Sequence, residues 1–190
     1  MPFLFSFSIV LLLLIFGKQI NPRFLSRVSW KALFGIALAG TGAFLIFQSY
    51  LQYQVFQKGL IGPVLGSGGG TIWFLSYIRF HIWNTYLISF LASILFFFIA
   101  KWLNARRGGQ LFYDEEFLIG STVFFLVGYP GILLYLALLL FSGVIGSSIS
   151  SFLTKKKELF PLYFLWSPLG IFVILIINYF SPVWLSLFRF

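Results

Sequence analysis

The feature that most constrains this chain is its long uninterrupted apolar runs. Residues 117–153 contain no charged side chain, and similar runs cover most of the remaining sequence. Only 9% of the 190 residues are charged and 60% are hydrophobic, whereas a soluble domain carries about 25% charged residues. Since helices satisfy their own backbone hydrogen bonds in lipid, we predict an all-α polytopic membrane helical bundle that forms one domain, residues 1–190.

The lengths of the runs predict about six transmembrane helices, because a spanning helix needs about 20 apolar residues. The turn sequence "GYPG" at 128–131 divides the longest run into two spans. Residues 72–103 are too long for one ordinary span, so we predict an interfacial segment at 72–84 before the third span. The alternative is one long tilted helix whose Arg79 reaches toward the lipid headgroups. The six predicted spans cover residues 2–17, 32–56, 85–103, 117–128, 131–153 and 159–180.

The basic residues support this arrangement. With six spans, three loops fall on one side of the membrane, and they hold ten of the 13 lysines and arginines. These are Lys18, Arg23, Arg27, Lys31, Lys101, Arg106, Arg107, Lys155, Lys156 and Lys157. The positive-inside rule makes that side cytoplasmic. We therefore expect both termini on the non-cytoplasmic side of a bacterial or organellar inner membrane, with the lipid bilayer as a partner and no nucleic acid.

Three of the four acidic residues are consecutive: Asp114, Glu115 and Glu116. One interpretation is structural, with Asp114 as the N-cap of the next helix and the glutamates stabilising its dipole by about 0.3–1 kcal/mol. A catalytic interpretation needs two carboxylates that share a proton. Adjacent helical residues point in different directions, so Glu115 and Glu116 are poor partners for Asp114. The remaining acid, Glu158, lies in another loop on the same side.

Other polar features are sparse. His81 is the sole histidine, it lies close to Arg79 and Asn84, and cysteine is absent, so we expect no metal site and no cofactor. The glycine-rich stretch at 66–70 lacks the lysine of a phosphate-binding loop. The small residues at 143–151 predict that span five packs inside the bundle or against other membrane protein subunits.

A family resemblance rests on the layout of residues 86–175. A span ends in the glycine-containing loop "NARRGGQLFYDEEF", a short hairpin follows, and the basic segment "TKKKELFPLYFLWSPLG" leads into the last span. This layout resembles the core of prepilin leader peptidases, which are membrane aspartic peptidases. The resemblance implies that Asp114 is a catalytic aspartate. The family's first aspartate would lie at the end of span one, where "LLIFGKQINPRF" has no acid, so the resemblance implies a relative without full catalytic activity.

Two alternatives from other functional classes remain. The stretch "LFYDEEFLIGSTVFFLV" is also similar to the start of the membrane segment of organellar ATP synthase subunit b. That resemblance implies a small hydrophobic structural subunit of a multi-protein membrane complex. A small transporter or channel is the third possibility, for which residues 79–84 supply the polar groups.

Overall fold

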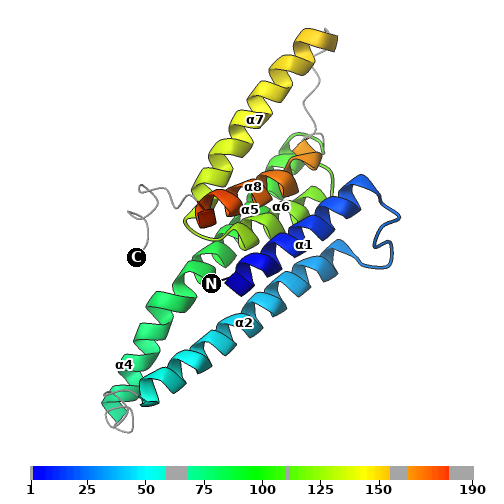
Figure 1. Ribbon diagram of the computed structural model, residues 1–190. Coiled ribbons are helices and arrows are strands. Elements are labelled where there is room, and N and C mark those ends of the chain that lie inside the picture. The colour runs from blue at the N-terminus through cyan, green and yellow to red at the C-terminus, as the bar shows by residue number, and fades with distance from the viewer. Residues whose placement is uncertain (1, 59–67, 110–111, 155–161, 180–190) are drawn as a thin grey trace.

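The computed structural model describes residues 2–58, 68–109, 112–154 and 162–179, and all regular secondary structure in these ranges is helical (Figure 1). The elements are α1 (Pro2–Ile20), α2 (Trp30–Lys58), α4 (Gly68–Ile78), the π-helical turn η1 (Arg79–Trp83), α5 (Asn84–Arg106), α6 (Glu116–Val127), α7 (Gly131–Thr154), the 3₁₀ turn η2 (Leu162–Phe164) and α8 (Trp166–Tyr179). This confirms the all-α fold.

Five of the described helical segments are long and apolar enough to cross a membrane, as in a polytopic membrane protein. The sixth, α6, has 12 residues and is about 18 Å long. The hydrocarbon core of a bilayer is about 30 Å thick, so α6 cannot cross it alone.

The segments that we predicted separately at 72–84 and 85–103 form one continuous run. The helical backbone extends over 37 residues from Gly70 to Arg106, a length of about 55 Å. Residues 71–106 contain neither glycine nor proline, so no residue stops the helix, and the polar residues at 79–84 fall on a π turn within it. The interfacial position of 72–84 stays a prediction.

The centre of the bundle is α6. Each of its residues from Glu116 to Val127 except Leu118 is buried, and α1, α2, α5, α7 and α8 all pack against it. A Cβ atom at Gly120 would lie 2.5 Å from Cε1 of Phe96, and one at Gly170 would lie 2.6 Å from Cγ1 of Val123. The two glycines therefore let α5 and α8 approach α6 closely, as small residues do between membrane helices.

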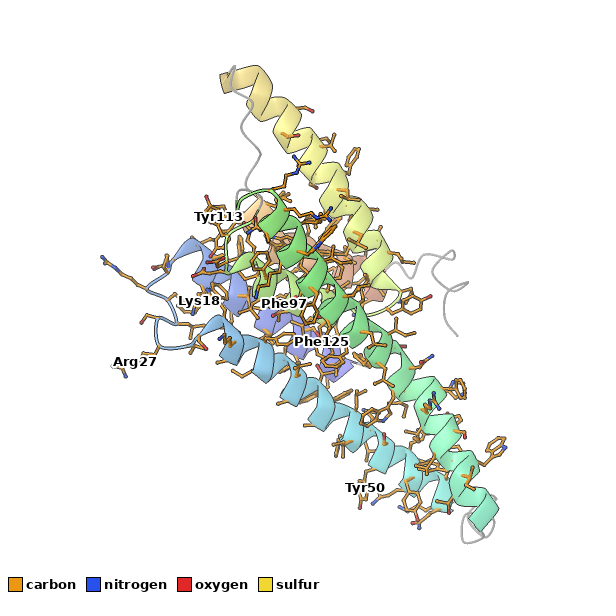
Figure 2. The ribbon with its side chains drawn as sticks, turned by 180° about the vertical axis from the view of Figure 1, so that it is seen from behind. Lys18, Arg27, Tyr50, Phe97, Tyr113 and Phe125 are labelled. Atoms are coloured by element: carbon orange, nitrogen blue, oxygen red, sulfur yellow. The ribbon has the colours of Figure 1, made fainter. Side chains whose placement is uncertain are left out.

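The outer half of α2 and the α4–η1 segment form a second, smaller apolar cluster around Leu45, Phe74 and Ile78. These two helices extend away from the central bundle (Figure 1). Figure 2 shows Tyr50 toward this end, and Lys18, Arg27 and Tyr113 toward the other. The two basic loops that follow α1 and α5 thus lie at the same end, as the predicted topology requires.

Candidate functional site

The three consecutive acids lie in different environments. Asp114 and Glu115 are exposed, whereas the side chain of Glu116 is only 2% exposed. The N-cap of α6 is Glu115, without a side-chain hydrogen bond, so the prediction of Asp114 as N-cap is wrong. The chain enters the helix through a backbone turn instead, in which the N–H of Glu116 donates to the carbonyl of Tyr113 (2.9 Å).

Glu116 points into the bundle and meets α8. The indole Nε1 of Trp166 donates to Oε2 of Glu116 at 3.4 Å, and Trp166 is itself held by Tyr135, whose hydroxyl donates to its carbonyl at 3.1 Å. Burial raises the pKa of the Glu116 carboxyl to about 7, although hydrogen bonds from Trp166 and the backbone of Tyr113 act in the opposite direction. Glu116 lies at the loop end of α6, outside the five helical segments that are long and apolar enough to cross a membrane.

The last turn of α1 reaches the same place through Gln19, which is 3% exposed. Its amide nitrogen donates to the carbonyl of Tyr163, and its amide oxygen accepts from Oγ of Ser167 at 2.7 Å. The hydroxyl of Tyr163 in turn donates to Oε2 of Glu115 at 3.4 Å. These contacts join α1, α6, η2 and α8. We call the following set the Glu116 cluster: Gln19, Glu115, Glu116, Tyr163, Trp166 and Ser167.

Two polar side chains hold the loops beside the cluster. The Asn104 side chain donates to the carbonyl of Phe112 at 3.2 Å and accepts from its N–H at 3.0 Å, which closes the α5–α6 connection. The amine of Lys18 donates to the carbonyls of Leu25 and Val28 and lies 4.7 Å from the centroid of the Trp30 ring. Both loops are therefore anchored to helix ends next to the cluster.

The chemistry available to the cluster follows from its groups. It offers one buried carboxyl, Glu116, whose pKa is raised by burial to about 7, and one exposed carboxyl, Glu115. The other groups are an amide, a serine hydroxyl, a tyrosine hydroxyl and an indole N–H. Among the described residues, every carboxylate side chain belongs to residues 114–116, so no second helix contributes one. Glu158 lies outside the described residues. Within the described ranges, no group of three histidine or acidic side chains is placed to hold a metal ion.

Reasoning from the sequence singled out Asp114 and missed Glu116 and Gln19. A helical spacing could have indicated Gln19, which follows the buried residues Leu12 and Ile15 by seven and four positions. Residues at this spacing share a helix face, so Gln19 continues a face that enters the core. No such signal marks Glu116, because α6 is buried on nearly all sides and exposed Glu115 also precedes a buried residue, Ile119, by four.

The polar patch at residues 79–84 lies at the other end of α6 from Glu116. The His81 ring packs against Tyr77, with ring centroids 4.6 Å apart, and the Arg79 guanidinium lies 5.9 Å from the centroid of the Phe80 ring. His81 and Asn84 also line a cavity of about 640 Å³. The structure thus separates this patch from the acidic cluster.

The small-residue stretch at 143–151 falls on α7. Residues 143–148 are exposed or half-buried, so span five is not buried inside the bundle in this part, and the alternative, packing against another subunit, stays a prediction. Of the glycine-rich stretch, Gly68–Gly70 begin α4, and residues 66 and 67 lie outside the described residues, as do Lys155–Lys157. Comparisons of the chain with protein-family models, with curated proteins and with solved structures found no match.

Proposed function

We propose that this polytopic membrane protein is built on the layout of a prepilin leader peptidase core and does not hydrolyse peptide bonds. The observation that carries the proposal is the composition of the Glu116 cluster. Its one buried carboxyl is Glu116, and the neighbouring helices contribute the amide of Gln19 and the hydroxyl of Ser167. Among the described residues, no second helix contributes an acid.

An aspartic peptidase mechanism depends on the second acid. One carboxylate activates water while the other, protonated, donates to the substrate carbonyl, and two close carboxylates share a single proton. The resemblance would place the first of these acids at the end of span one. There α1 presents Gln19, and an amide neither takes up nor releases a proton near neutral pH. Asp114, at the family's motif position, is exposed and not inside the cluster.

The test is cleavage of a peptide that carries a prepilin-type leader. The purified protein in lipid nanodiscs should leave the leader intact, while a working prepilin peptidase prepared in the same way cleaves it. Cleavage by the wild-type chain that disappears in Asp114→Asn would refute the proposal. The variant Gln19→Asp, which returns an acid to the end of α1, tests whether the missing carboxylate is the limiting group.

A second candidate function, a structural subunit of a membrane complex, is favoured by α7. Figure 1 shows the outer half of α7 standing away from the other helices. Its apolar side chains are highly exposed, with Leu140 at 68%, Phe141 at 64% and Val144 at 65%. Small residues alternate with them, which suits close packing against another membrane helix.

This candidate is tested by placing a photo-crosslinking amino acid at Val144 in the native membrane. The matched control is Leu95 on α5, which is 61% exposed. A structural subunit should crosslink from Val144, and not from Leu95, to one protein that also co-purifies at fixed stoichiometry. Crosslinking to lipid alone from both positions would reject this function.

A further inference from the structure

The helix α6 ends partway along its membrane-crossing neighbour. Two hydrogen bonds fix its register against α5: Ser93 Oγ donates to the carbonyl of Ser121, and the N–H of Tyr129 donates to Ser89 Oγ, each at 2.7 Å. Ser89 lies five residues inside the start of α5 at Asn84, which is about 7.5 Å along the helix axis. The end of α6 is therefore alongside the membrane-crossing segment and not beyond it.

The last turn of α6, like that of any helix, has carbonyls without intrahelical donors. Tyr129 and Pro130 stand four residues after Phe125 and Leu126, where a continuing helix would supply donors for their carbonyls. The N–H of Tyr129 is directed to Ser89 Oγ, and Pro130 has no N–H. A helix C-terminus also carries about half a negative charge. Carbonyls of this kind are tolerated at membrane depth where they face protein or line a water-filled cavity.

A cavity lies at this point. It has a volume of about 640 Å³, and its wall on the α6 side is the segment from Leu126 to Pro130. Polar side chains from three helices also line the cavity: Ser8 on α1, Asn84 and Thr85 on α5, and Asn178 on α8. The π turn η1 borders the cavity through His81, and π turns within α-helices occur frequently at functional sites.

The lining also contains Tyr86 and Tyr129, and its apolar side chains include Leu4, Ile174 and Ile177. No carboxylate, lysine or arginine is among the described residues that line the cavity. A mainly apolar cavity of this size with a few convergent polar groups has the properties of a small-ligand site. Backbone carbonyls and the negative end of α6 favour a ligand group that donates hydrogen bonds.

We propose that this cavity holds water inside the bundle and binds an amphiphile whose head group donates hydrogen bonds, either a hydroxyl or an ammonium. The head group lies against the end of α6, and the apolar chain lies along Leu4, Ile174 and Ile177. A carboxylate head is disfavoured, because it would meet the carbonyls and the negative helix end without a lysine or arginine in the lining to pair with it. This inference does not depend on whether the protein hydrolyses peptides.

Hydration is tested by cysteine accessibility, since the chain contains no cysteine of its own. Ser8→Cys places a thiol in the cavity wall at a position that is 3% exposed. The controls are Ser93→Cys, buried away from the cavity, and Leu87→Cys, on the outer face of α5. Because the thiolate is the reactive form, we expect a charged methanethiosulfonate to modify Ser8→Cys in nanodiscs about tenfold faster than either control. Equal rates would overturn the proposal, and Thr85→Cys replaces Ser8→Cys if the latter does not fold.

Ligand class is tested by protection of the same thiol. Decanol, decylamine and decanoate share one apolar chain and differ in the head group. Rates are normalised to Arg27→Cys, on the exposed loop at the opposite end of the bundle. Decanol or decylamine should slow the modification of Ser8→Cys several-fold, and whichever protects better identifies the head as hydroxyl or ammonium. The assignment would be refuted if decanoate slowed the modification as much as decanol and decylamine do, or if none of the three slowed it.

Discussion

Replacing Glu116 with glutamine should make the protein more stable at neutral pH and leave it unchanged in acid. Burial raises the pKa of the folded-state carboxyl from 4.5 to about 7. The folded state therefore favours the protonated, neutral form. The wild-type protein has its full stability below about pH 4.5 and loses part of it as the pH rises through 7, because ionisation is then easier in the unfolded chain.

The size of the effect follows from that rise in pKa. At about 1.4 kcal/mol per unit of pKa change, the free energy of unfolding of the wild-type protein should fall by on the order of 3 kcal/mol between pH 4.5 and 8. Glutamine has nearly the same shape as protonated glutamate and keeps an oxygen that accepts from the indole of Trp166. In the Glu116→Gln variant, this position should therefore contribute no pH dependence to the free energy of unfolding. At pH 8 that free energy should exceed the wild-type value by on the order of 3 kcal/mol.

The assay is thermal unfolding in nanodiscs, followed by tryptophan fluorescence from pH 4.5 to 8. For a chain of this length, 1 kcal/mol corresponds to about 2–4 °C in Tm, so the two proteins should differ by about 6–12 °C at pH 8 and coincide at pH 4.5. Glu115→Gln is the matched control, because Glu115 is exposed, and its curve should follow the wild type. If the Glu116→Gln and wild-type curves run parallel across the range, Glu116 ionises as it would in water and the argument from burial fails.

Two further substitutions test the packing around α6 in the same assay. Gly120→Ala should lower the free energy of unfolding by about 1–3 kcal/mol, because its Cβ would lie 2.5 Å from a ring atom of Phe96. Gly35→Ala, where a Cβ meets nothing within 4 Å, should be neutral or stabilising by up to about 1 kcal/mol; equal losses at both glycines would contradict the close approach of α5 and α6. Gln19→Leu should cost about 1–3 kcal/mol for each buried group it leaves unpaired, whereas Gln57→Leu at an exposed position of α2 should change stability by less than about 0.5 kcal/mol. A neutral Gln19→Leu would show that α1 is not held to α8 through this amide.

The helices themselves could be predicted because their signals are local. Apolar length sets the spans, and the turn at 128–131 separates α6 from α7 where the sequence places glycine and proline. The predicted division of the chain at residue 84 is absent, because the signal on which it was based does not affect the backbone. Charged and polar side chains at Arg79, His81 and Asn84 resemble a helix boundary, yet none of them interrupts backbone hydrogen bonding, so the helix continues through a π turn.

The site could not be predicted in the same way, because it depends on contacts between distant segments. Glu116 is buried by Trp166, which is 50 residues further along the chain, and Gln19 meets Ser167 across 148 residues. The residues of α6 are apolar on all sides, so the sequence defines no polar face for this helix. Its periodicity therefore cannot indicate which of the three acids points into the bundle. A local rule that assigns the N-cap from residue type therefore selected Asp114, whereas the N-cap is Glu115 and tertiary packing buries Glu116.

The short length of α6 explains why polar groups gather at both of its ends. A helix that crosses the whole bilayer places its unpaired N–H and carbonyl groups at the two water interfaces. A helix of 12 residues surrounded by five others cannot do so, and the protein must supply partners for at least one end. At the first end, Glu116 places a carboxyl beside the positive end of the helix dipole, which favours its charge, while burial opposes that charge. At the second end, the hydroxyl of Ser89 accepts from the N–H of Tyr129, and the cavity lined by Leu126 to Pro130 adjoins the last turn, where we propose that water and a hydrogen-bond-donating head group bind. The two ends therefore differ in chemistry, one offering an exchangeable proton and the other offering acceptors, and they are the places where substitutions should alter function without removing the fold.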